Sequence, residues 1–343
     1  MKRMRLSGLV FMLAAGLHFA ALAQNSTVSA QRKPEEFGFR HLVMMFGKDS
    51  VDVLVQSPKG QEFDKKPVLF WAQGSLPKPV IMYDDRGTFG TFAFLSEQAQ
   101  LDCHIVIVGK PGIPLVADAG TLAPGYNYVD KSTGIPPLYY CQRNYLEYYV
   151  RRNEAVLRYL KKQPWVDKNR VVVGGHSEGS RIVAHLAAMP GLVSRAVYLS
   201  GSPLGRELTK LARDPADSTG TAAEMRFAQW QHAVDHPKQN DCTPGDSYQN
   251  LYSFGQSDLP LLFKARVPIF VGYGTRDAGT VANDYLRLES IRLHKTNFTF
   301  RPYVGREHNF FSFKDGKVNQ DDWYWEKVGN DFLRWAGLLP VSK

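Results

Sequence analysis

A serine between two glycines is the strongest chemical signal in the sequence. Residues 171–180 read VVVGGHSEGS, which places a Gly-x-Ser-x-Gly motif after a β-branched run and before an apolar pattern with helical spacing. Glycines at positions 175 and 179 let a strand and a helix approach closely at a sharp turn, so that the hydroxyl of Ser177 projects outward. We therefore predict that Ser177 is a nucleophile, with an ordinary turn serine as the alternative.

A nucleophilic serine needs a base to remove its proton and a carboxylate to orient that base. Asp277 follows the apolar run 268–272, and His308 follows the run 297–303. Both side chains are therefore expected at the carboxyl edge of a sheet, where such folds bind ligands. We predict that His308 is the general base for Ser177 and that Asp277 stabilises the imidazolium.

Other histidines and acidic residues compete for these two roles. Asp258 and Asp284 do not directly follow a strand pattern, as Asp277 does. The remaining histidines considered lie within a helix pattern, at a strand start or outside strand-end loops: His41, His104, His185, His232, His236 and His294.

The reaction also requires hydrogen-bond donors for the negative charge that develops on the substrate oxygen. The backbone N–H of Glu178 lies at the start of the helix that follows Ser177, where the helix dipole favours negative charge. A second donor is expected after the run 68–72, where the sequence continues QGS. We favour the backbone N–H of Ser75, with the side chain of Gln73 as the alternative donor.

Eight apolar runs predict the strands that position these residues: 41–46, 51–56, 68–72, 104–108, 171–174, 196–200, 268–272 and 297–303. From residue 68 onward most runs are unbroken and β-branched, as in parallel strands covered on both faces. Helical periodicity is found at 91–101, 143–163, 180–189, 283–293 and 321–338. This alternation predicts an α/β fold with a mostly parallel eight-stranded sheet, flanked by helices and joined by right-handed crossovers.

The segment 204–266 breaks this rhythm and predicts a cap insertion above the carboxyl edge of the sheet. Trp230 lies within it, and Tyr139 and Tyr140 follow another irregular stretch, 111–137. These three aromatic residues are candidates for lining a substrate pocket, although aromatic side chains in such segments also serve simply as packing groups.

Composition excludes several classes of protein. The chain has 343 residues, of which 44% are hydrophobic and 22% charged, with 29 Gly and 20 Pro. These values argue against disorder, collagen, coiled coils and multi-span membrane proteins. The formal charge is +9, but the basic residues are dispersed and do not interleave with aromatic residues, so no nucleic-acid partner is expected.

The N-terminus predicts export to a periplasmic or secreted location. Basic residues among the first five precede an apolar core at 9–17, and the small residues around position 22 fit a signal-peptidase site with cleavage after Ala23. An uncleaved membrane anchor is the alternative, while no stable membrane insertion is expected after cleavage. The expected divisions are a signal peptide, a polar segment and one α/β domain: 1–23, 24–39 and 40–343.

Three cysteines allow at most one disulfide. Cys141 and Cys242 fall in predicted loops and are the expected pair in an oxidising compartment, whereas Cys103 opens an apolar strand and is expected to be a buried free thiol. The sequence contains no HExxH motif, clustered metal ligands or phosphate-binding glycine loop, so it predicts neither a metal nor a cofactor.

The run 166–179, VDKNRVVVGGHSEG, resembles the α/β-hydrolase superfamily and its dienelactone-hydrolase and prolyl-oligopeptidase-like branch. The resemblance covers most of the chain and implies a cofactor-free serine hydrolase whose catalytic residues map onto Ser177, Asp277 and His308. Two positions depart from that branch. Ser180 stands where many of its peptidases have a further glycine, and dienelactone hydrolases use a cysteine where this chain has Ser177.

These patterns together predict an exported serine hydrolase that cleaves ester or related acyl bonds of a small-molecule substrate through an acyl-enzyme. One alternative is a small-peptide hydrolase of the prolyl-oligopeptidase-like type. Another is a catalytically silent binding protein on the same fold, since a fold does not determine a function. The sequence leaves the acyl length, the leaving group and the oligomeric state open.

Overall fold

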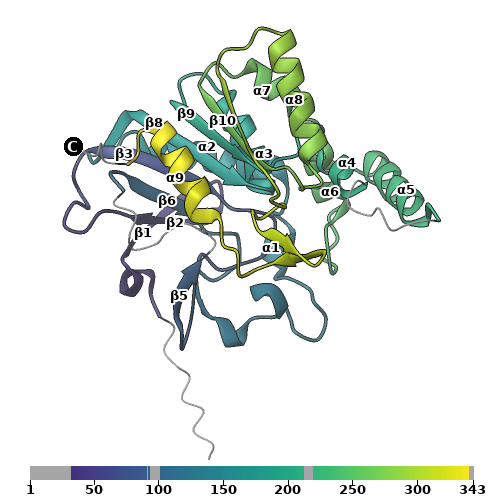
Figure 1. The fold of residues 1–343 in the computed structure, drawn as a ribbon. Coiled ribbons are helices and arrows are strands. Elements are labelled where there is room, and N and C mark those ends of the chain that lie inside the picture. Colours follow the sequence, from purple (N-terminus) through teal and green to yellow (C-terminus); the bar gives the residue numbers. More distant parts are fainter. Residues whose placement is uncertain (1–31, 91, 93–100, 212–218, 340–343) are drawn as a thin grey trace, which may run out of the picture. The chain divides into compact units, whose positions relative to one another are not determined.

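The computed structural model describes residues 32–90, 92, 101–211 and 219–339, which contain an eight-stranded sheet with helices on both faces (Figure 1). The strand order is β1-β2-β6-β3-β8-β9-β10-β11. Strand β2 is antiparallel to β1 and β6, and all other neighbours are parallel. The bounds are β1 Phe39–Phe46, β2 Asp49–Gln56, β3 Lys66–Ala72, β6 His104–Val108, β8 Val166–His176, β9 Arg195–Leu199, β10 Ile269–Gly274 and β11 Phe298–Tyr303. The predicted strands and fold class are confirmed.

The helices that flank the sheet divide the core into two layers. On one face Phe70 of β3 and Val173 of β8 pack with α2, α3 and α8, and on the other face Trp71 and Val172 pack with α9. Successive side chains of a strand point to opposite faces, so an unbroken apolar strand supplies both layers. In the described part of the chain, the α-helices outside the 204–266 segment are α1 Leu138–Cys141, α2 Leu146–Leu160, α3 Glu178–Ala187, α8 Thr280–Arg292 and α9 Trp325–Ala336.

Some boundaries differ from the prediction. Strand β8 begins at Val166, five residues before the predicted run 171–174, because Val166 pairs with Lys66 across a register shift in β3. The short strands of two minor sheets were not predicted, since runs of three or four residues carry little periodicity. They are β4 Ile81–Asp84, β5 Gly87–Gly90, β7 Val116–Asp118, β12 Ser312–Lys314 and β13 Lys317–Asn319.

The predicted signal peptide 1–23 lies outside the described residues, as do residues 24–31 of the predicted polar segment 24–39 and most of the predicted helix 91–101. Among the helices that are described, none combines the length and the apolar character needed to cross a membrane.

The predicted insertion connects β9 to β10 and contributes helices beyond one end of the sheet. Figure 1 shows α4, α5 and α6 together, with α5 projecting furthest. The four helices of the insertion are α4 Arg206–Leu211, α5 Thr221–Asp235, α6 Tyr248–Gly255 and α7 Leu259–Lys264.

A disulfide joins this insertion to the core of the chain. Cys141 and Cys242 are bonded, with 5.4 Å between their Cα atoms, and Cys103 is a buried free thiol. Both predictions about the cysteines are confirmed. Cys141, however, is the last residue of the short helix α1 and does not lie in a loop. Burial raises the pKa of the Cys103 thiol to about 12.

Candidate active site

Ser177 occupies a sharp turn between β8 and α3. Its backbone has φ 58° and ψ −123°, a conformation that is costly for a residue with a Cβ atom. The flanking glycines allow the turn, because a Cβ on Gly179 would overlap the carbonyl oxygen of Ala72, and a Cβ on Gly175 would overlap the backbone of Gly179. The strain is therefore located at the residue whose hydroxyl must project.

The structure brings together the three residues that the sequence selected. His308 Nε2 lies 2.9 Å from Ser177 Oγ, and His308 Nδ1 lies 2.9 Å from Asp277 Oδ2. The side chain of Asp277 is only 1% exposed, and its other oxygen accepts the backbone N–H of Gly279 at 3.2 Å. A neutral imidazole protonated on Nδ1 donates to Asp277 and leaves Nε2 free to accept the serine proton.

The competing acids have other partners. Asp258 is fully buried and receives Arg181 Nη2 at 2.9 Å, and Asp284 accepts the hydroxyl of Tyr273 at 2.5 Å. Neither carboxylate contacts His308 among the hydrogen bonds and ion pairs of the described residues. Each instead satisfies a buried polar partner, which is a structural role.

The competing histidines likewise occupy other environments. His104 contacts the hydroxyl of Ser57 at 2.8 Å and the carbonyl oxygen of Asp64 at 2.9 Å. Burial lowers the pKa of His185 to about 4, which keeps this imidazole neutral at physiological pH. His232 packs its ring against Tyr248 in the insertion.

The loop that carries His308 is held by contacts that sequence reasoning missed. His176, which directly precedes Ser177, has its Nε2 2.8 Å from the carbonyl oxygen of His308. The carboxylate of Glu307 accepts the backbone N–H groups of Asn309 at 2.6 Å and Phe311 at 3.1 Å. The contact made by His176 had one signal in the sequence: a polar side chain at the first variable position of the Gly-x-Ser-x-Gly motif.

The two favoured oxyanion donors lie beside the same cavity as Ser177. Glu178 begins α3, where the first N–H groups of a helix have no partner within the helix. Ser75 follows β3, and its carbonyl oxygen accepts the hydroxyl of Tyr140 at 2.9 Å, which fixes this loop. The prediction of Gln73 as the alternative donor is wrong. Its side-chain amide donates to the carbonyl oxygen of Val108 at 2.7 Å, and the residue lines a separate small cavity.

A cavity of about 620 Å³ opens beside Ser177 and His308. Of the predicted pocket residues, Tyr140 lines it, and the other two require correction. Tyr139 lies outside its lining and packs beneath the guanidinium of Arg143, 3.8 Å from the ring centre. Trp230 also lies outside the lining, because its ring stacks on Tyr252 of α6.

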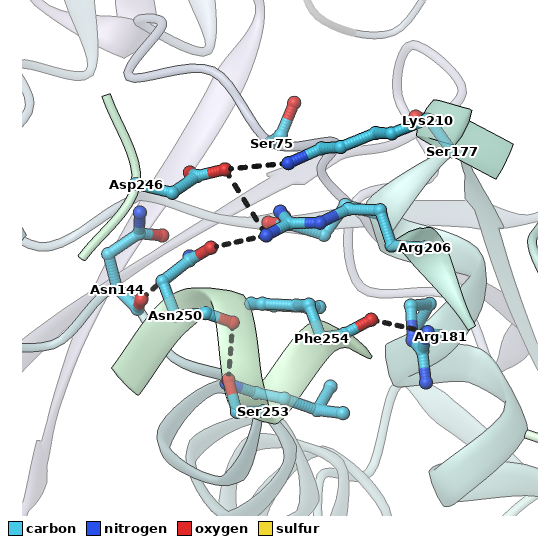
Figure 2. Close-up of polar contacts among 12 residues, drawn as sticks. Ser75, Asn144, Ser177, Arg181, Arg206, Lys210, Asp246, Asn250, Ser253 and Phe254 are labelled. Atoms are coloured by element: carbon cyan, nitrogen blue, oxygen red, sulfur yellow. Dashed lines mark hydrogen bonds and ion pairs between the residues drawn. The ribbon is translucent and has the colours of Figure 1, made fainter. Parts of the chain in front are cut away.

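Charged residues of the insertion form part of the cavity wall. Arg206 and Lys210 of α4 both contact Asp246, at 3.2 Å and 3.4 Å (Figure 2). Arg206 Nη1 also lies 3.0 Å from Glu178 Oε2. Burial raises the pKa of Glu178, although the positive charges of Arg206 and Lys110 act in the opposite direction. The predicted insertion therefore reaches Glu178, the residue next to Ser177.

The described residues contain no group of three or more His, Cys, Asp or Glu side chains placed to hold a metal ion.

No family model and no curated protein matches this sequence. The structure is similar to acylaminoacyl peptidase from Pyrococcus horikoshii, with a TM-score of 0.53 and 14% identity over 89% of this chain and 42% of that one. It is also similar to dipeptidyl peptidase 4 from Porphyromonas gingivalis, with a TM-score of 0.52 and 12% identity over 88% of this chain and 35% of that one.

An α/β hydrolase from Penicillium sp. sh18 has a TM-score of 0.51 and 13% identity, over 88% of this chain and 97% of that one. The chain thus spans less than half of each peptidase but corresponds in length to this third protein. These similarities show that the chain has the α/β-hydrolase fold.

Proposed function

We propose that this protein is a serine hydrolase that cleaves ester or related acyl bonds of small molecules. The observation that carries the proposal is the position of His308, which is within hydrogen-bond distance of both Ser177 Oγ and Asp277 Oδ2. A strained serine, an oriented imidazole and a buried carboxylate are the three parts that serine hydrolysis requires.

In the proposed mechanism Ser177 Oγ attacks the acyl carbon while His308 Nε2 takes the hydroxyl proton. The resulting oxyanion is held by the backbone N–H groups of Glu178 and Ser75. His308 then donates its proton to the leaving group, and an acyl-enzyme remains on Ser177. Water, activated by His308, hydrolyses this ester and restores the free serine. Asp277 stabilises the imidazolium during both halves of the cycle.

A small-peptide hydrolase is the second candidate. Asp246 lines the cavity with its side chain 32% exposed, so its carboxylate is accessible to the ammonium group of a peptide N-terminus. Two proteins of similar fold are named as peptidases. The ratio of kcat/KM for p-nitrophenyl esters to that for aminoacyl p-nitroanilides discriminates between the two candidates, and a clear preference for the anilides would favour the peptidase.

The decisive experiment for the hydrolase proposal is labelling with a fluorophosphonate probe, followed by peptide mass spectrometry. We expect the label on Ser177, no label in Ser177→Ala, and slower labelling in His308→Ala. Ser194→Ala is the matched control, because Ser194 donates to the carbonyl oxygen of Val171 and does not line the cavity. A folded wild-type protein that stays unlabelled would favour the silent binding protein.

We also propose that the protein is exported and functions in an oxidising compartment, either periplasmic or secreted. The leader-like residues 1–23 and the bond between Cys141 and Cys242 support this proposal, because disulfides persist mainly outside the cytosol. N-terminal sequencing of protein recovered from native cells should begin at Gln24. An intact N-terminus on protein found in the cytosol would contradict it.

A further inference from the structure

We infer that Arg206 is a positioning residue for the proposed hydrolase: it neutralises the carboxylate of Glu178 beside the oxyanion site, so that turnover depends on a cation supplied by the insertion. The inference rests on the proposed function. It assigns a role to a residue of the insertion that has no contact with Ser177, Asp277 or His308 among the hydrogen bonds and ion pairs of the described residues.

Glu178 carries two opposed features. Its backbone N–H is the proposed donor to the oxyanion, whereas its side chain is an acid placed one residue from the nucleophile. That side chain is 3% exposed, so water screens its charge poorly. A carboxylate in this position opposes the negative charge that develops on the substrate oxygen, unless a cation compensates for it.

Arg206 supplies the compensating charge through a short contact. Its Nη1 lies 3.0 Å from Glu178 Oε2, and this is the ion pair that Glu178 forms within the described part of the chain. Lys110 is a second nearby cation, but its buried ammonium forms neither a hydrogen bond nor an ion pair with Glu178 among the described residues. Arg206 is therefore the cation that contacts the carboxylate directly.

Other contacts fix the guanidinium of Arg206 in place. Its Nη2 donates to Asn250 Oδ1 at 3.0 Å and lies 3.2 Å from Asp246 Oδ2 (Figure 2). Asn250 in turn donates to the carbonyl oxygen of Asn144 at 2.8 Å, which ties α6 to the segment before α2. The guanidinium of Arg206 is thus held by Asn250 and Asp246 of the insertion on one side and by Glu178, at the start of α3, on the other.

A purely structural ion pair would make a different prediction. If Arg206 only stabilised the fold, its loss would lower the amount or the thermal stability of folded protein, and each folded site would still turn over normally. If it neutralises Glu178, its loss must slow each folded site, and removing the carboxylate as well must restore the rate. The two roles are therefore separated by measuring kcat per reactive site.

The test uses the full chain and p-nitrophenyl acetate as the substrate, with active sites counted by fluorophosphonate labelling and stability followed by Tm. We expect R206M to lower kcat per labelled site by about tenfold or more, because the uncompensated carboxylate of Glu178 would oppose stabilisation of the oxyanion. The double variant R206M/E178Q should return to within about threefold of the wild type, since it has no uncompensated carboxylate. R206K, which keeps the charge, should lie between R206M and the wild type.

The outcomes separate the two proposals. An unlabelled and inactive wild type overturns the proposed function and this inference with it. A labelled, active wild type combined with an unchanged R206M overturns the inference alone. Should R206M not fold, the double variant still decides, because it removes both partners of the Arg206–Glu178 pair while Asp246 keeps its contact with Lys210. A kcat per site about tenfold below the wild type would then overturn the inference.

Discussion

The imidazole of His176 is hydrogen bonded to the backbone of His308, with 2.8 Å between Nε2 and the carbonyl oxygen. A carbonyl oxygen can only accept, so His176 carries its proton on Nε2. The ring of His176 also packs edge-on against Trp325 and near Phe310. The residue before the proposed nucleophile thus holds the loop that carries the proposed base, and it links these two segments across 132 positions of sequence.

Replacing His176 tests this coupling. His176→Phe keeps an aromatic ring but removes the donor, so we expect kcat for p-nitrophenyl acetate to fall about tenfold, because His308 is less well oriented. His176→Gln retains an N–H donor and should keep more activity than the phenylalanine variant. Wild-type kcat in His176→Phe, with Tm unchanged, would show that the hydrogen bond does not position the base.

Two buried aspartates should respond differently to the same substitution. Asp277→Asn removes the charge that stabilises the His308 imidazolium, and we expect kcat to fall by about 10³- to 10⁴-fold with little change in stability. Asp258→Asn leaves Arg181 buried without its ionic partner and should lower the unfolding free energy by about 3–5 kcal/mol. Steady-state kinetics and urea titrations of both variants check the contrast, which would fail if Asp258→Asn proved the catalytically impaired one.

The disulfide should contribute substantially to stability. Replacing Cys141 and Cys242 together by serine releases a constraint on the unfolded chain, and we expect the unfolding free energy to fall by about 2–5 kcal/mol. Urea denaturation measures the difference. Reduction of the wild type provides the control, since it should reproduce the stability of the double variant while Cys103 stays unreactive in the native protein. Equal midpoints before and after reduction would contradict the expectation.

Acidification should destabilise the protein through His185. Burial lowers the pKa of His185 from 6.5 to about 4 in the folded protein, so the unfolded chain takes up the proton first as the pH falls. Its contribution is fully present above the unfolded pKa and is lost as the pH falls through the folded pKa. We expect this loss to be about 3 kcal/mol. Denaturant titrations across this window should give a flatter pH profile for His185→Gln, and parallel profiles would exclude the residue.

The fold could be predicted because its elements carry local patterns. The central strands are unbroken apolar runs, since helices cover both faces of the sheet. The turn at Ser177 shows in the sequence because its backbone geometry requires glycine at positions 175 and 179. The same logic located Asp277 and His308, as each directly follows a strand whose apolar run is clear.

The cavity wall could not be predicted in the same way. The position of Gln73 after β3 suggests a donor to substrate, but its amide donates to the carbonyl oxygen of Val108, at the end of the neighbouring strand β6. The aromatic character of Trp230 suggests a pocket residue, but its ring stacks on Tyr252 of the next helix. Both outcomes depend on how a side chain rotates toward a neighbour distant in sequence, and no local periodicity records that choice.

The bond between Cys141 and Cys242 closes a covalent ring that contains Ser177, while Asp277 and His308 lie outside it. A protease that cuts the backbone once anywhere between the two cysteines produces two fragments that remain attached to each other. Such a nicked protein migrates as one species on a gel until a reducing agent is added. A single cut in the part of the insertion that precedes Cys242 therefore cannot detach Ser177 from the rest of the molecule, and cleavage there is visible on the gel only after reduction.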